Sequence, residues 1–156
     1  MTRVRSTAID RRRKAWLAET RPADQLLILT LRRWLDGPDG QEAVWNGLAR
    51  EIGAVPARRL LKTFECFLIA LSRGVRRTLT RHAACCPCVG ADELLLADMV
   101  RAAGRGDHET AGARAAEVVR VADRAIVLER AEKLGLLLDD MGLDPVSGVE
   151  ARARLH

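Results

Sequence analysis

The stretch that decides the fold is residues 55–93, VPARRLLKTFECFLIALSRGVRRTLTRHAACCPCVGADE. Pro56 suits the first turn of a helix, where its missing N–H would have no partner within the helix. Apolar side chains then recur every three or four residues, which is the period of one helical face: Leu60, Phe64, Phe67, Leu71, Val75 and Leu79. The spacing predicts a long and largely buried helix that continues to about Arg81.

The end of this helix carries a compact group of side chains that bind metals. Four residues of the types that zinc prefers follow one another closely: His82, Cys85, Cys86 and Cys88. Pro87 disfavours helical geometry at Cys86, so the thiols are expected in a loop. Arg77 and Arg81, just before the loop, are expected to stabilise the thiolates. The pattern predicts a metal site, with Zn²⁺ as the candidate ion.

The spacing of the donors bears on how many chains form the site. Cys85 and Cys86 are adjacent, so their side chains point in different directions, and one chain is expected to supply only two or three donors. A structural zinc ion takes four ligands. A second copy of the chain would complete the set, which predicts a homodimer.

The same loop supports a redox interpretation. Cys85-Cys86-Pro87-Cys88 resembles the thioredoxin-type motif Cys-Gly-Pro-Cys, with Cys86 in place of glycine. The resemblance implies a thiol redox enzyme that uses Cys85 and Cys88. A third interpretation is that the thiols are structural and carry no chemistry.

Residues 48–62 resemble the helix-turn-helix of repressor-type regulators. Ala49 and Gly53 have the four-residue offset of that motif, and Ile52 stands just before the glycine of the turn. The resemblance implies a DNA-binding regulator in which the second helix reads base edges. Its contact residues would be Ala57, Arg58, Arg59 and Lys62. The alternative is two core helices joined by a glycine turn.

The rest of the chain predicts more helices and no strand. Besides the long helix, apolar periodicity and glycine or cap signals delimit helices over about 22–36, 41–52, 91–103, 108–120 and 124–141. The predicted fold is all-α, a compact orthogonal bundle of about six helices. We predict a basic flexible segment over 1–20, a single helical domain over 21–142 and a tail over 143–156.

Composition narrows the class of protein. Residues 1–20 carry six basic and two acidic side chains, and the remaining 136 residues sum to only +1 of the net charge of +5. The body is therefore not a basic nucleic-acid binder, and a protein partner is favoured over nucleic acid. No signal peptide and no apolar run of about 18 residues are visible, which predicts a cytoplasmic chain without a membrane partner. Thiols stay reduced in that compartment.

These observations favour a small cytoplasmic protein whose Cys/His loop binds a metal ion or senses thiol state. We expect a regulatory or adaptor role, and the sequence favours a non-enzymatic function without deciding it. The alternatives are the helix-turn-helix regulator and the thiol redox enzyme.

Overall fold

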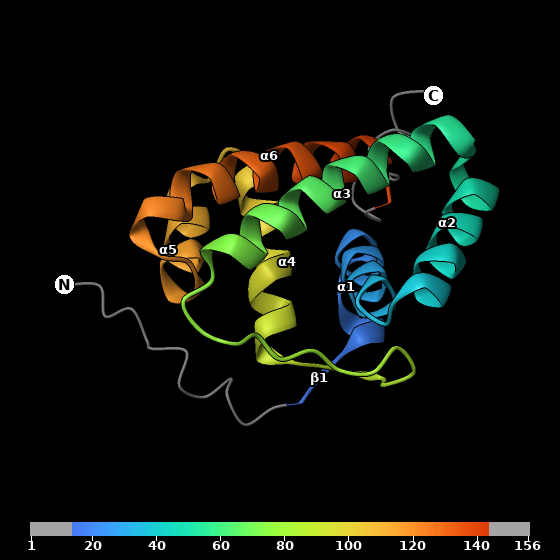
Figure 1. Ribbon diagram of the computed structural model, residues 1–156, viewed down its shortest axis with the longest axis horizontal. Coiled ribbons are helices and arrows are strands. Elements are labelled where there is room, and N and C mark those ends of the chain that lie inside the picture. The colour runs from blue at the N-terminus through green and yellow to red at the C-terminus, as the bar shows by residue number, and fades with distance from the viewer. Residues whose placement is uncertain (1–13, 144–156) are drawn as a thin grey trace, which may run out of the picture.

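The computed structural model describes residues 14–143, and this part of the chain is a helical bundle (Figure 1). Its helices are α1 (Pro22–Trp34), α2 (Pro38–Ile52), α3 (Ala54–Gly74), α4 (Ala91–Gly104), α5 (His108–Val118) and α6 (Arg124–Asp140). A two-stranded antiparallel ladder joins β1 (Ala15–Trp16) to β2 (Cys88–Val89). The prediction of an all-α bundle is confirmed, and the short ladder is the one departure from the prediction of no strand within the described residues. None of the helices within 14–143 is both long and apolar enough to cross a membrane.

The core lies where α6 meets α3 and α4. Helices α3 and α6 lie side by side and run in opposite directions across one face, with α4 beneath them (Figure 1). Helices α4 and α6 approach most closely at Gly104 and Gly135, where a Cβ on either glycine would clash with the backbone of the other helix. The two glycines therefore set the distance between these helices.

Local signals account for most helix boundaries. Gly37 and Gly53 adopt positive φ angles of 106° and 90°, which glycine allows at little cost, and they separate α1 from α2 and α2 from α3. Helix α2 begins at Pro38, three residues earlier than predicted, because proline fits the first helical position. A 3₁₀ turn at Val121–Asp123 separates α5 from α6, at the predicted break.

The prediction that the long helix continues to Arg81 is wrong, because α3 ends at Gly74. Val75 is extended (φ −64°, ψ 137°) and forms a bridge with Val119. The Arg120 N–H donates to the Gly74 carbonyl at 2.8 Å, so the backbone here bonds to the end of α5 instead of continuing the helix. The connection to α4 then runs along one edge of the molecule toward β1 (Figure 1).

The first described residues are ordered against this connection. Ala15 pairs with Val89 and Trp16 with Cys88, and the Leu17 N–H donates to the Pro87 carbonyl at 2.8 Å. A 3₁₀ turn at Leu17–Glu19 follows. Residues 15–19 belong to the segment 1–20 for which flexibility was predicted, and that flexibility stays a prediction. Residues 1–13 and 144–156, which include nearly all of the predicted tail, lie outside the described residues.

Candidate metal centre

Three of the four predicted ligands converge in the connection between α3 and α4. The Nδ1 atom of His82 lies 3.4 Å from the Cys86 sulfur and 3.5 Å from the Cys88 sulfur. The two sulfurs are 3.0 Å apart, and all three side chains are partly buried. These atoms form a group that could hold a metal ion.

The fourth predicted ligand, Cys85, is not part of this group. Its side chain is exposed, and the group of mutually close donors contains only His82, Cys86 and Cys88. The turn that places the loop is closed by the Cys86 N–H, which donates to the Ala83 carbonyl at 3.0 Å. Cys85 lies within this turn and Cys86 at its end, so the two adjacent thiols diverge.

The distances suit a tetrahedral zinc site. Zn–N and Zn–S bonds of about 2.0 and 2.3 Å place the nitrogen about 3.5 Å from each sulfur and the two sulfurs about 3.8 Å apart. The nitrogen–sulfur distances of 3.4 and 3.5 Å already agree. The sulfurs are 3.0 Å apart and would have to separate by about 0.8 Å to hold the ion in this geometry.

A buried arginine that sequence reasoning missed holds this loop in place. Arg32 of α1 is fully buried, and its guanidinium donates to the carbonyls of Cys86 at 2.8 Å and Cys88 at 2.7 Å. A longer bond of 3.3 Å reaches the carbonyl of Ala83. The same guanidinium forms a bidentate ion pair with Glu93 of α4, with both N···O distances 2.8 Å. One side chain therefore joins α1, α4 and the two cysteines of the candidate metal group.

Glu93 completes this arrangement from the other side. Its carboxylate accepts the His82 N–H at 2.9 Å and the Gly90 N–H at 2.9 Å, the second of which caps α4. Burial acts to raise the pKa of Glu93, but Arg32 and the two backbone donors outweigh it and lower the pKa. Glu93 is therefore ionised and fully paired. We name Arg32 and Glu93 together the buried ion pair.

The two arginines predicted to stabilise thiolates form ion pairs with carboxylates. Arg77 donates to both oxygens of Asp92, at 2.7 and 3.1 Å, and Arg81 donates to Asp36 at 2.9 Å. The Thr80 N–H also donates to Asp92 at 2.8 Å, so these pairs tie the connection to α4 and to the turn that follows α1. The hydrogen bonds from Arg77 lower the pKa of Asp92 to about 2.

The pKa values of the two cysteines in this group are shifted in opposite directions. Hydrogen bonds from the Cys88 thiol, the Cys88 backbone N–H and His82 lower the pKa of Cys86 to about 7. The hydrogen bond with Cys86, and then burial, raise the pKa of Cys88. One thiolate is therefore available near neutral pH to begin binding a cation, since the thiolate is the form that binds metals.

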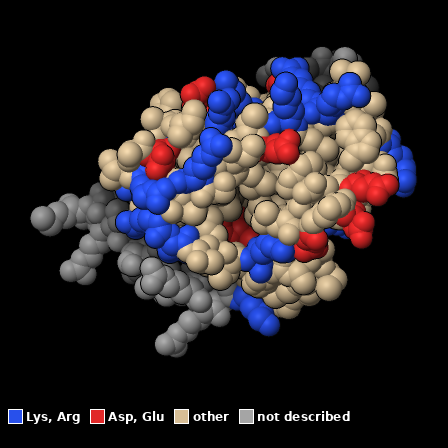
Figure 2. Space-filling model, viewed as in Figure 1, with Lys and Arg blue, Asp and Glu red and all other residues tan. Residues whose placement is uncertain are grey.

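Of the four residues predicted to contact DNA, one is buried and three are exposed. Ala57 is fully buried, so it is withdrawn from that set, whereas Arg58, Arg59 and Lys62 are exposed. On the face shown in Figure 2, basic side chains lie in separate groups interrupted by acidic and uncharged residues. A continuous basic surface is the usual electrostatic feature of a nucleic-acid binder.

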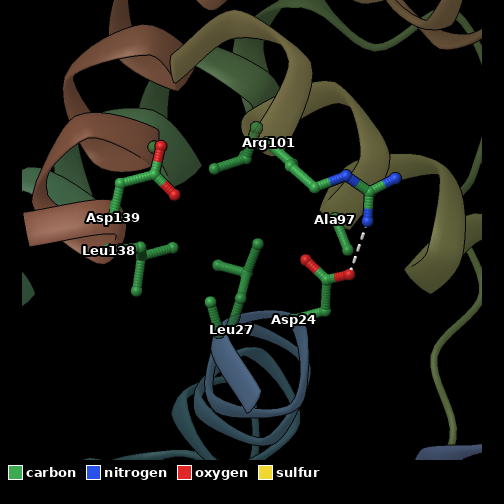
Figure 3. Close-up of a pocket in the computed structure, with 9 residues that line it drawn as sticks. Asp24, Leu27, Ala97, Arg101, Leu138 and Asp139 are labelled. Atoms are coloured by element: carbon green, nitrogen blue, oxygen red, sulfur yellow. Dashed lines mark hydrogen bonds and ion pairs between the residues drawn. The ribbon is translucent and has the colours of Figure 1, made fainter. Parts of the chain in front are cut away.

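A small cavity between α1, α4 and α6 offers no competing site. Asp24, Leu27, Ala97 and Leu138 are among its lining residues, and Arg101 donates to Asp24 across its edge at 2.7 Å (Figure 3). Its volume of about 10 Å³ is roughly what one water molecule needs. A larger ligand does not fit there.

No protein-family model, curated protein or solved structure matches this chain.

Proposed function

We propose that this protein is a zinc-binding protein in which His82, Cys86 and Cys88 hold one Zn²⁺ ion. The observation that carries the proposal is the convergence of one imidazole nitrogen and two sulfurs at distances of 3.4, 3.5 and 3.0 Å. Imidazole and thiolate together favour zinc over the hard cations Mg²⁺ and Ca²⁺, which prefer oxygen ligands.

The surroundings of the donors support a site that is formed before the ion arrives. Arg32 fixes the backbone carbonyls of both cysteines, and Glu93 fixes the backbone N–H of His82. Groups that orient ligands in this way typically change metal affinity by about 10-fold to 100-fold. Because the fold already holds the backbone of the three donor residues, the ion would have less of the loop to order when it binds.

The proposed role is regulatory or adaptor-like. The metal site touches three parts of the fold: the loop itself, β1 through its pairing with β2, and α1 through Arg32. A ligand that binds only the folded chain stabilises it by mass action, so zinc supply would set how firmly these parts are joined. The homodimer and the cytoplasmic location stay predictions, and a site in which three donors of one chain hold the ion does not require a second copy.

Zinc titration of the full chain tests the proposal. Metal-free protein is expected to take up one equivalent of Zn²⁺ per chain, and uptake should protect two thiols from a thiol reagent. The double variant Cys86→Ser/Cys88→Ser should take up none, and the matched variant Cys66→Ser, altered in α3, should behave as the parent. A parent protein that binds no zinc at micromolar concentration would refute the proposal.

A second candidate function is thiol redox chemistry at the same pair. The sulfurs of Cys86 and Cys88 are 3.0 Å apart, which favours this pair over the Cys85–Cys88 pair that the thioredoxin resemblance implies. With a peroxide as oxidant, the two thiols lose two electrons and two protons, and one S–S bond forms. The O–O bond of the peroxide breaks, which gives two water molecules from hydrogen peroxide, or one water and one alcohol from an organic peroxide.

Oxidation of metal-free protein by hydrogen peroxide is expected to join Cys86 to Cys88. Peptide mapping by mass spectrometry should find this disulfide in the parent and in Cys85→Ser, and none in Cys88→Ser. Bound zinc should slow the reaction, because its sulfur ligands are no longer free. A Cys85–Cys88 disulfide, or no intramolecular disulfide, would contradict this second candidate.

A further inference from the structure

The proposed site has fewer donors than a closed zinc site. Structural zinc ions take four protein ligands, whereas sites with three keep one position for an exogenous ligand. Within residues 14–143, the group that could hold an ion contains three residues. The two nearby carboxylates already have cationic partners: Asp92 pairs with Arg77, and Glu93 pairs with Arg32.

The ladder between β1 and β2 places two further side chains beside the donors. Trp16 lies directly opposite Cys88, and opposite residues of an antiparallel pair project from the same face of the ladder. Lys14 precedes Trp16 by two residues, and its Nζ lies 6.0 Å from the centroid of the Trp16 ring. Ala15 and Val89 project from the other face and contact the core.

These two side chains are accessible to a ligand. Trp16 is 42% exposed although it is a large apolar side chain, and Lys14 is exposed as well. An exposed indole supplies a flat apolar surface, and the ammonium group supplies a positive charge. Trp16 lies on the face of the ladder from which the Cys88 side chain projects, and the Lys14 ammonium lies beside the Trp16 ring.

We propose that the fourth position of the bound metal is open and takes an organic anion. The anionic donor atom binds the metal near Lys14, and the apolar part of the anion packs on Trp16. This inference rests on the proposed metal site and goes beyond it, since it names the class of ligand that binds the metal at its fourth position. No covalent step is involved.

Cobalt(II) replaces zinc as a spectroscopic probe in the test. Its visible bands report the number of thiolate ligands and any change of the fourth ligand. Acetate and benzoate are titrated into the cobalt-loaded full chain. Both are expected to shift the bands, and benzoate should bind roughly threefold to tenfold more tightly because its ring packs on the indole.

Variants separate the parts of the proposal. Trp16→Ala should remove the preference for benzoate, Lys14→Gln should weaken both anions severalfold, and Cys85→Ser should leave the bands unchanged. Bands that do not respond to either anion, or that lose a thiolate contribution in Cys85→Ser, would overturn the open position. Failure of cobalt and zinc to bind at all would instead refute the proposed metal site itself.

Discussion

Replacing Arg32 by methionine is expected to lower the free energy of unfolding by about 3–5 kcal/mol, because it leaves the buried Glu93 carboxylate without its cation. The guanidinium is fully buried and also donates to the carbonyls of Cys86 and Cys88, which would lose these donors. Typical domains are stable by about 5–15 kcal/mol, so the loss is a large part of the total. Urea unfolding followed by circular dichroism measures it.

The neighbouring residue provides a matched control. Arg33 lies on the same helix with an exposed side chain, so Arg33→Met should change the unfolding free energy by less than about 0.5 kcal/mol. Equal effects of the two substitutions would contradict the role assigned to Arg32. The double variant Arg32→Met/Glu93→Leu should recover part of the loss, because no unpaired charge then remains in the interior.

The effect of Arg32→Met should also depend on pH. In the parent, the pKa of Glu93 is lowered, so its contribution to stability is present above the pKa of the unfolded chain and is lost as the pH falls through the folded value. In the variant, burial acts without Arg32 and opposes ionisation of Glu93. The difference in unfolding free energy should therefore be largest near neutral pH and shrink in acid.

The helices were predictable because their limits are local. Gly37 and Gly53 occupy positive φ angles that few other residues tolerate, and Asp107 caps α5 by accepting the Thr110 N–H. The 3₁₀ turn at Val121–Asp123 lies where the sequence predicted a break, between the helices expected over 108–120 and 124–141. Each signal acts within a few residues of the boundary it sets.

The early end of α3 was not predictable from periodicity. Val75 and Leu79 continue the apolar spacing, and both are partly buried against the core as the pattern requires. However, the backbone at Val75 is extended, and its neighbours Gly74 and Arg76 bond to Arg120 and Val118, more than 40 positions away. Apolar spacing reports burial of a side chain, whereas the choice between helix and bridge here depends on a distant segment.

Three of the four candidate ligands predicted from the sequence come together in the structure, but the residues that hold them in place were not predicted. His82, Cys86 and Cys88 are close in sequence, so their chemistry was visible there. Arg32 and Glu93 are 61 positions apart, and a charged residue near a helix end has a sufficient local explanation. The one available signal was an arginine within a strongly apolar helix, where a buried cation requires a buried anion.

The second large effect is expected from replacing single ligands. Cys88→Ser and Cys86→Ser should each raise the dissociation constant for Zn²⁺ by more than about 100-fold, because loss of an orienting outer group alone costs about 10-fold to 100-fold. His82→Gln should act in the same direction. Competition with a chromophoric zinc chelator measures the constants, and circular dichroism of each metal-free variant shows whether it is folded.

Cys85→Ser makes this experiment decisive, because it shows whether the ion has three ligands from this loop or four, with the Cys85 sulfur as the fourth. The thiol of Cys85 is exposed and adjacent to Cys86, yet it lies outside the group formed by His82, Cys86 and Cys88. Its removal should change the dissociation constant by less than about threefold, well below the effect of a lost orienting group. If Cys85→Ser weakened zinc binding as much as Cys88→Ser, the ion would have four ligands from this loop and no position for another. The three-donor geometry would then not describe the metal-bound state, and the proposed organic anion would have nowhere to bind.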